Sequence, residues 1–255
     1  MKKYQWGKLV LLSMAICCFE ACSSDNTAEE PMQEMMEEES AEEAAEESDD
    51  DESLPDRIIY LERDGIISVE FETVEGEIEW ERGSTLEGFD GEGYLVWNNP
   101  DSFQMPGNGM LTYKLNISTP GTYRFIWRSR ITEGETQSEA NDSWLRFNDA
   151  ADFFGECDGR IVYPRGTGKT PNPEGSSADG WFKVYMNRVG EWFWRSNTSD
   201  NDPHDIFVTF DEPGVYTMEV SGRSKFHGLD RFVLYVEGKT FEEAESAERS
   251  EIVRP

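Results

Sequence analysis

Residues 221–236 read Ser-Gly-Arg-Ser-Lys-Phe-His-Gly-Leu-Asp-Arg-Phe-Val-Leu-Tyr-Val, which is the end of one strand, a short polar loop and a last strand. In the last strand, apolar residues surround a single acidic residue, Asp230. An unpaired carboxylate among apolar neighbours is costly, so a positive charge must compensate it. Acidic residues far upstream indicate that this charge is a bound cation, and the rest of the chain would bring those acidic residues to this loop.

The clearest strand pattern upstream lies on both sides of the turn pair Pro120-Gly121. Residues 110–117 and residues 123–128 each alternate apolar with polar side chains, which predicts two antiparallel strands joined as a hairpin. Residues 57–238 contain many such short strands, separated by turn signals, and no sustained helical period. This pattern predicts an all-β domain built as a β-sandwich.

The first 22 residues have the features of an export signal. Three lysines precede an apolar run at residues 9–19, which is too short for a transmembrane helix. The Phe-Glu-Ala-Cys sequence that follows resembles the end of a bacterial lipoprotein signal, with Cys22 as the lipidated residue. The alternative is a soluble secreted form.

Residues 23–57 are expected to form a disordered acidic tether. Residues 23–56 contain sixteen acidic residues and no Lys or Arg, so like charges repel and too few apolar residues remain to fold. Ser23-Ser24-Asp25 also resembles the acidic surface-export signals of some Gram-negative lipoproteins. We therefore expect an outer membrane lipoprotein, exposed at the cell surface and attached to the membrane only through its lipid.

Residues 58–238 form the expected domain, which is large enough to bury a full core. From residue 57 to 238 there are 31 acidic and 17 basic residues, a net charge of −14, which argues against nucleic acid as a partner. Cys157 is the one cysteine outside the signal region, so no disulfide forms inside the mature chain. Residues 239–255 are charged and are expected to be a frayed or weakly helical tail.

Six pieces of sequence occur in a distinctive order. They are Val69-Glu70-Phe71-Glu72, Gly91-Glu92-Gly93-Tyr94-Leu95-Val96-Trp97, Pro120-Gly121-Thr122-Tyr123-Arg124-Phe125, Asn141-Asp142-Ser143-Trp144, Pro213-Gly214-Val215-Tyr216-Thr217-Met218-Glu219-Val220 and Gly228-Leu229-Asp230-Arg231-Phe232. Together they resemble the galactose-binding-like jelly roll of family 6 and family 35 carbohydrate-binding modules, over nearly all of residues 57–238. The resemblance implies a sandwich of two antiparallel sheets.

The resemblance also implies a structural calcium site. In such modules, acidic residues of an early strand and an aspartate near the start of the last strand hold the ion, and these positions match Glu70, Glu72 and Asp230. Calcium prefers several hard oxygen ligands, so the residue types are suitable. The alternative is that both glutamates are solvated and that Asp230 pairs with Arg231 or Arg223.

The resemblance further implies that loops at one end of the sandwich bind a polysaccharide or oligosaccharide. Aromatic rings stack on sugar faces, and polar side chains hydrogen-bond the hydroxyls. Gly190-Glu191-Trp192 resembles the family's Gly-x-Trp strand, and the polar position of the last loop falls at residues 225–227, without the Asn that many relatives carry. The candidate glycan-binding residues are Trp97, Arg130, Asn141, Asp142, Trp181, Trp192, Trp194, Arg223 and His227.

Each candidate also has a structural alternative. Tryptophans belong to the core more often than to a ligand site, and Asn141 and Asp142 stand at a loop-to-strand junction where they can cap a turn. Arg130 and Arg223 can neutralise buried carboxylates, and His227 can be an ordinary loop histidine.

These features predict a non-catalytic, monomeric surface lipoprotein that captures polysaccharide. A second hypothesis is an envelope protein-interaction or structural module that kept the fold without sugar binding. A polysaccharide lyase or hydrolase is disfavoured, because the chain has two histidines and no Gly-x-Ser-x-Gly or His-Glu-x-x-His motif. Convergence of Trp192, Trp194 and His227 in an exposed cleft would favour sugar binding, and their burial on opposite sheets would favour the second hypothesis.

Overall fold

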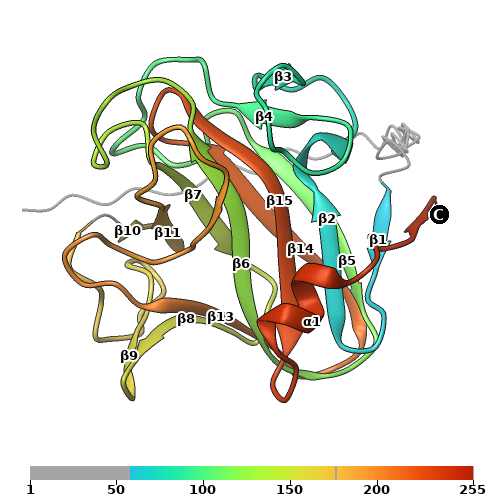
Figure 1. The fold of residues 1–255 in the computed structure, drawn as a ribbon. Helices are drawn as coiled ribbons and strands as arrows, with labels where there is room; N and C mark the ends of the chain where they lie inside the picture. The colour runs from blue at the N-terminus through green and yellow to red at the C-terminus, as the bar shows by residue number, and fades with distance from the viewer. Residues whose placement is uncertain (1–57, 176, 255) are drawn as a thin grey trace, which may run out of the picture. The chain divides into compact units, whose positions relative to one another are not determined.

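The computed structural model describes residues 58–175 and 177–254, so the expected signal peptide, Cys22 and the acidic tether lie outside the described residues. The described chain forms two packed β-sheets and one short α-helix (Figure 1). The prediction of an all-β sandwich of the jelly-roll type is confirmed. Within the described residues, no helix is long and apolar enough to cross a membrane.

The first sheet has seven strands in the order β10-β11-β7-β14-β5-β1-β16. Strand β1 pairs parallel with β5, and the other neighbours pair antiparallel. The bounds are β1 Ile59–Leu61, β5 Leu111–Ile117, β7 Asp142–Phe147, β10 Ser177–Ala178, β11 Trp181–Tyr185, β14 Gly214–Gly222 and β16 Ile252–Val253.

The second sheet follows the order β3-β4-β15-β6-β13-β8-β9, with β2 paired to β15 and β12 paired to β6. The long strand β15 therefore joins both halves of this sheet (Figure 1). The bounds are β2 Ile66–Glu70, β3 Glu81–Gly83, β4 Tyr94–Val96, β6 Gly121–Ile131, β8 Asp152–Cys157, β9 Arg160–Val162, β12 Phe193–Trp194, β13 Asp205–Phe210 and β15 His227–Val236, and a 3-10 turn, Phe71–Thr73, follows β2.

The core lies between the two sheets and follows the alternation in the sequence. On β5, the apolar residues Leu111, Tyr113, Leu115 and Ile117 are each at most 1% exposed, while the residues between them are half-buried. Side chains alternate across a strand, so the apolar residues of β5 all lie on one face, which is buried, and the residues between them lie on the other face. Aromatic rings from opposite sheets then fill the interior.

The hairpin expected around Pro120-Gly121 is wrong, although both of its strands exist. Strand β5 pairs with β1 and β14, whereas β6 pairs with β15 and β13, so the connection crosses from one sheet to the other. Glu62, a buried carboxylate, holds this crossing by accepting the N–H groups of Ser118 (2.8 Å) and Thr119 (2.7 Å). The alternating pattern is the same in a hairpin and in a crossing, so local sequence does not distinguish the two.

Of the two expectations for residues 239–254, a frayed or a weakly helical tail, the structure bears out the helical one for a short part of the segment. Thr240 and Glu243 form a capping box at the start of helix α1, Phe241–Ser246, and Ala244 is fully buried. The chain then returns to the first sheet, where β16 pairs with β1. In Figure 1 the helix lies over β15 and β2, and the strand that follows runs beside β1.

Candidate functional site

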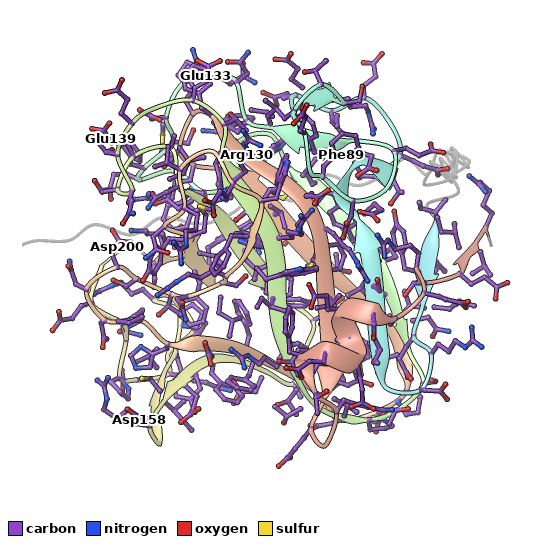
Figure 2. All side chains as sticks on the ribbon, in the orientation of Figure 1. Phe89, Arg130, Glu133, Glu139, Asp158 and Asp200 are labelled. Carbon is purple, nitrogen blue, oxygen red and sulfur yellow. The ribbon has the colours of Figure 1, made fainter. Side chains whose placement is uncertain are left out.

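A wide cleft of about 860 Å³ opens at one end of the sandwich. The loop after β6, the loop between β14 and β15, and residues 101–104 surround it. Figure 2 labels Glu133 and Glu139 on its rim, at the opposite end of the domain from Asp158. This loop-end cleft is where the resemblance predicts a ligand.

Two aromatic rings line the loop-end cleft, and neither was predicted from the sequence. The side chain of Phe103 is 45% exposed, and Phe226 is partly exposed. The guanidinium of Arg223 lies 5.0 Å from the Phe103 ring centre, and the Lys225 ammonium lies 4.6 Å from that of Phe226. An aromatic residue inside a polar loop is the sequence signal that indicates each of these rings.

A buried carboxylate orders the polar side of the cleft. Asp142 is 2% exposed and accepts hydrogen bonds from Arg223 Nη1 and Ser224 Oγ, both at 2.5 Å. The Lys183 ammonium lies 3.5 Å from Asp142 and donates to Asp200 at 2.8 Å. Of the predicted glycan-binding residues, Asp142 and Arg223 therefore line this cleft.

Asn141 lies next to this cleft but points into the protein. It is 2% exposed, and its Nδ2 donates to the carbonyl oxygens of Gln137 (3.0 Å) and Met186 (3.1 Å). It therefore anchors the loop after β6 instead of facing a ligand, which corrects the expectation that it contacts sugar.

His227 is also turned inward. It is fully buried, its Nδ1 lies 2.8 Å from Ser143 Oγ, and its ring packs near Trp127. Burial lowers the pKa of His227 to about 3, so the ring is neutral at physiological pH. A fully buried side chain cannot reach a ligand in the cleft, so the expected contact is not made.

Two of the predicted tryptophans belong to the interior. Trp97 is 2% exposed, packs against Trp80, and donates from Nε1 to the Pro100 carbonyl at 3.1 Å. Trp181 is 2% exposed, with the Arg146 guanidinium 4.4 Å from its ring centre. Neither ring has an open face of the size that a sugar needs, because each is covered by protein.

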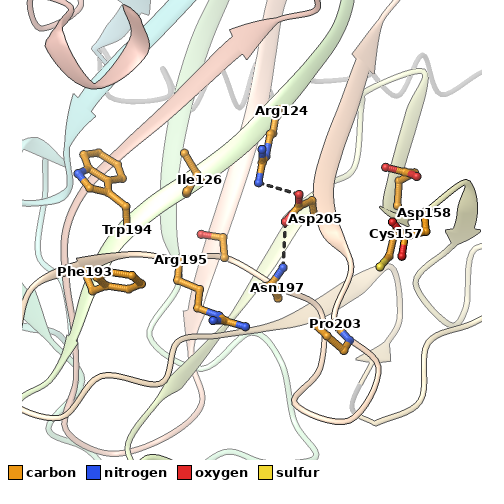
Figure 3. Close-up of a pocket in the computed structure, with 12 residues that line it drawn as sticks. Arg124, Ile126, Cys157, Asp158, Phe193, Trp194, Arg195, Asn197, Pro203 and Asp205 are labelled. Carbon is orange, nitrogen blue, oxygen red and sulfur yellow. Dashed lines mark hydrogen bonds and ion pairs between the residues drawn. The ribbon is translucent and has the colours of Figure 1, made fainter. Parts of the chain in front are cut away.

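The remaining two tryptophans lie apart from the cleft and from each other. Trp192 packs against Tyr94 with ring centres 5.0 Å apart, and Arg130 lies 5.8 Å from its ring centre. Trp194 lines a pocket of about 610 Å³ on the outer face of the second sheet (Figure 3). Trp192, Trp194 and His227 therefore do not converge.

The acidic cluster, which we define as Glu70, Glu72, Asp90 and Asp230, forms where β2 meets β15. Register places Arg231 opposite Glu70, and a bulge between Leu229 and Arg231 displaces Asp230. Asp230 is fully buried and accepts the Asp90 N–H at 3.1 Å. It pairs with Arg128, and not with Arg231 or Arg223 as the alternative supposed.

In both glutamates of the acidic cluster, one carboxylate oxygen accepts a hydrogen bond and the other has no hydrogen-bond partner. Glu70 Oε1 accepts from Arg249 Nε, and Glu72 Oε1 accepts the Gly93 N–H at 3.1 Å. The Oε2 atoms of Glu70 and Glu72 are buried without a hydrogen-bond partner. The Glu70 side chain is 8% exposed, so the alternative of a solvated glutamate does not hold for it.

Burial raises the pKa values of two carboxylates in the acidic cluster. Burial, and then the neighbouring Glu70 and Asp230, raise the pKa of Glu72 to about 7. Burial raises the pKa of Asp230 to about 7 against the opposing effect of Arg128. The neutral forms of Glu72 and Asp230 are therefore favoured more than those of solvated carboxylates.

The residues present fit a calcium ion in their chemistry. Two buried carboxylate oxygens lack a partner, and Gly91 and Gly93 bring backbone against the cluster: a Cβ on Gly91 would lie 2.9 Å from Glu70 Cδ. Within the described residues, no three acidic, His or Cys side chains converge closely enough to hold an ion as they stand. Arg128 and Arg249 instead contact Asp230 and Glu70.

Comparison with solved structures finds chains that contain family 35 or family 6 carbohydrate-binding modules, the two families that the sequence resembles. A Podospora anserina mannanase with a family 35 module is 12% identical, with a TM-score of 0.39, over 70% of this chain and 29% of its own. The module Xyl-CBM35, solved with a disaccharide containing glucuronic acid, is 11% identical, with a TM-score of 0.38, over 68% of this chain and 99% of its own. A family 6 module of Cellvibrio mixtus lichenase 5A, solved with cellotriose, is 12% identical, with a TM-score of 0.32, over 68% of this chain and 96% of its own.

No known family matches the sequence, and no curated protein matches it. The chain spans less than a third of the mannanase that it resembles. Identities this low indicate a similar fold and nothing about function. The function is therefore inferred from the side chains of this protein.

Proposed function

We propose that the described domain is a non-catalytic module that binds a polysaccharide or oligosaccharide in the loop-end cleft. The observation that carries this proposal is the pair of accessible rings, Phe103 and Phe226, beside the ordered polar groups of Asp142, Lys183 and Arg223. Apolar faces of sugar rings pack on aromatic side chains, and hydroxyls take hydrogen bonds from cations and carboxylates.

The expected affinity is modest. The cleft is wide and open to water, so a bound sugar exchanges water contacts for protein contacts of similar strength. Ordering of Arg223 and Lys183 by Asp142 before binding reduces the entropy lost when a ligand arrives. A module of this kind would hold a polymer reversibly.

A structural calcium ion is part of the proposal. Glu70, Glu72 and Asp230 would hold it, together with backbone oxygens near Gly91. The ion would neutralise carboxylates whose pKa values are raised, and would tie the start of β15 to β2. Its part is to stabilise the scaffold, because the ligands lie in the acidic cluster and not among the residues lining the cleft.

The proposed setting is the outer surface of a cell. Cys22 would carry the lipid, residues 23–57 would extend the domain outward, and the protein would act as a monomer. The lipid site and the outward extension rest on the sequence pattern of residues 1–57.

A protein-interaction module is the second candidate, and a specific observation favours it. Trp192, Trp194 and His227 do not converge, and the side chain of Met105 is 64% exposed close to Phe103 in sequence. Exposed methionine and phenylalanine side chains are common on surfaces that bind protein partners. The same cleft would then receive a peptide instead of a sugar.

A glycan array with the purified chain tests the first candidate. Specific binding that is lost in Phe103→Ala and in Phe226→Ala, and kept in Phe154→Ala, would support the loop-end cleft. Phe154 is a matched control because it is a partly exposed phenylalanine on β8, stacked on Phe207. Absence of binding to every neutral and acidic glycan would favour the protein-interaction candidate.

A further inference from the structure

The C-terminal segment, residues 239–254, reaches the acidic cluster through a series of specific contacts. Helix α1 packs on β15 and β2, and Arg231 Nη2 donates to the carbonyl of Ala247 at 3.1 Å, at the C-terminal end of the helix. Ser250 and Ser68 then exchange two hydrogen bonds, of 2.8 and 3.0 Å. These contacts fix the position of Arg249, which lies between the helix and β16.

Arg249 enters the acidic cluster from the solvent side. Its Nε contacts Glu70 Oε1, and its Nη2 lies 3.7 Å from Asp90 Oδ2. Its side chain is 39% exposed, whereas those of Arg231 and Arg128 are 3% and 16% exposed. Of these three arginines, Arg249 is therefore the one that solvent already reaches, so it can leave the cluster with the least rearrangement of the surrounding protein.

Counted with every carboxylate ionised, the acidic cluster has one more negative charge than the arginines that face it. Three guanidinium groups, of Arg128, Arg231 and Arg249, face the four carboxylates of the cluster. The buried Oε2 atoms of Glu70 and Glu72 have no partner. A divalent cation on those oxygens would turn the deficit of positive charge into an excess, so it would repel the guanidinium that shares Glu70 with it.

We propose that the C-terminal segment carries a built-in counter-ion: Arg249 neutralises Glu70 when no divalent cation is bound, and calcium binding and docking of Arg249 oppose each other. The inference rests on the calcium site proposed above. Arg249 thus stabilises the metal-free domain and weakens its affinity for calcium. Because the coupling is reciprocal, calcium also loosens the segment around Arg249.

Calorimetric titration of the purified, chelator-treated full chain with calcium tests this coupling. We expect Arg249→Gln to bind calcium roughly tenfold more tightly than the unmodified protein, which is within the usual range of such couplings. Arg249→Lys, which keeps the charge but loses the second donor group, should fall between them. Arg254→Gln is the matched control, because Arg254 lies on the same segment but pairs with Glu75, outside the acidic cluster. Its calcium affinity should stay within about twofold of that of the unmodified protein.

Hydrogen exchange of residues 247–254 gives a second readout that does not depend on the affinity. Calcium should speed exchange in this segment of the unmodified protein and leave it unchanged in Arg249→Gln. Equal or weaker calcium binding by Arg249→Gln would overturn the inference while the calcium site itself stands. Absence of calcium binding by both proteins would overturn the proposed calcium site together with the inference about Arg249. The proposal that the loop-end cleft binds glycan would be unaffected in either case.

Discussion

The ring of Trp194 lies edge-on to the ring of Phe241, with centroids 5.6 Å apart, and so joins β12 to the C-terminal helix. Arg231 lies 5.6 Å from the centre of the same indole ring. A tryptophan that the sequence pattern placed at a sugar site therefore packs against the C-terminal segment. Several measurable consequences follow from this and from the other long-range contacts.

Trp194→Ala should loosen the C-terminal segment without affecting glycan binding. Loss of a partly buried indole and its edge-on contact should lower the free energy of unfolding by about 2 kcal/mol. Hydrogen exchange of residues 241–253 should become faster. Phe193→Ala, a change at the neighbouring residue of β12, should leave that exchange rate unaltered, and equal acceleration in both variants would refute the assignment.

Glu62→Gln should destabilise the crossing between β5 and β6. The Glu62 carboxylate accepts hydrogen bonds from the N–H groups of Gly65, Ser118 and Thr119. A hydrogen bond to a charged acceptor contributes about 1.5–3 kcal/mol to the free energy of unfolding. We expect a loss of about 2 kcal/mol at pH 7, measured by urea unfolding. Glu75→Gln, which removes an exposed ion pair with Arg254, should cost less than about 1 kcal/mol.

The effect of Glu62→Gln should also depend on pH. Burial acts to raise the pKa of Glu62, but hydrogen bonds from Ser118 and Gly65 outweigh it, so the pKa lies below its usual value. The stabilisation is then present above the pKa of the unfolded chain, and is lost as pH falls through the lower pKa of the folded protein. A stability difference that stays constant from pH 7 to pH 3 would contradict this.

Gly91→Ala should be more destabilising than Gly76→Ala. Both glycines have positive φ, +71° and +90°, so both substitutions pay a backbone cost of about 1 kcal/mol. A Cβ at position 91 would also lie 2.9 Å from Glu70 Cδ, whereas nothing lies within 4 Å at position 76. We expect an additional loss of about 1–3 kcal/mol for Gly91→Ala in thermal unfolding. Equal losses would show that the loop does not press on Glu70.

His227 should make the domain lose stability in mild acid. Its pKa is about 3 in the folded protein and near 6.5 in the unfolded chain, so between these values only the unfolded chain takes up the proton. This one group should lower the free energy of unfolding by up to about 1.4 kcal/mol per pH unit below pH 6. In His227→Gln that contribution disappears, so the stability difference from the unmodified protein should shrink between pH 7 and pH 5. A difference independent of pH would refute it.

Local sequence predicted the strands well, because side-chain alternation is a property of a single strand. The apolar positions of residues 111–117 are buried as expected, and Glu70, Glu72 and Asp230 come close enough for their charges to interact. The grouping of Glu70, Glu72 and Asp230 was expected from the family resemblance, whereas the isolated Asp230 by itself indicates only that a positive charge lies nearby.

The partners of those residues were not within reach. Asp230 meets Arg128 from the neighbouring strand, and Glu70 meets Arg249 from the segment that was expected to be frayed or weakly helical. In the same way, the sequence did not separate the rings of Phe103 and Phe226, which line the cleft, from those of Trp97 and Trp181, which are buried. Each of these outcomes depends on which sheet a strand joins.

The sequence by itself determined that this chain is an all-β sandwich with an acidic site at its last strand, because alternation and isolated charges act over a few residues. The tertiary structure alone decided that β5 and β6 lie in opposite sheets. It also decided that the C-terminal segment places the Arg249 guanidinium in the acidic cluster, and that the aromatic rings lining the loop-end cleft are phenylalanines. These depend on contacts between residues 56 to 179 positions apart, where the burial of whole sheet faces outweighs any local preference.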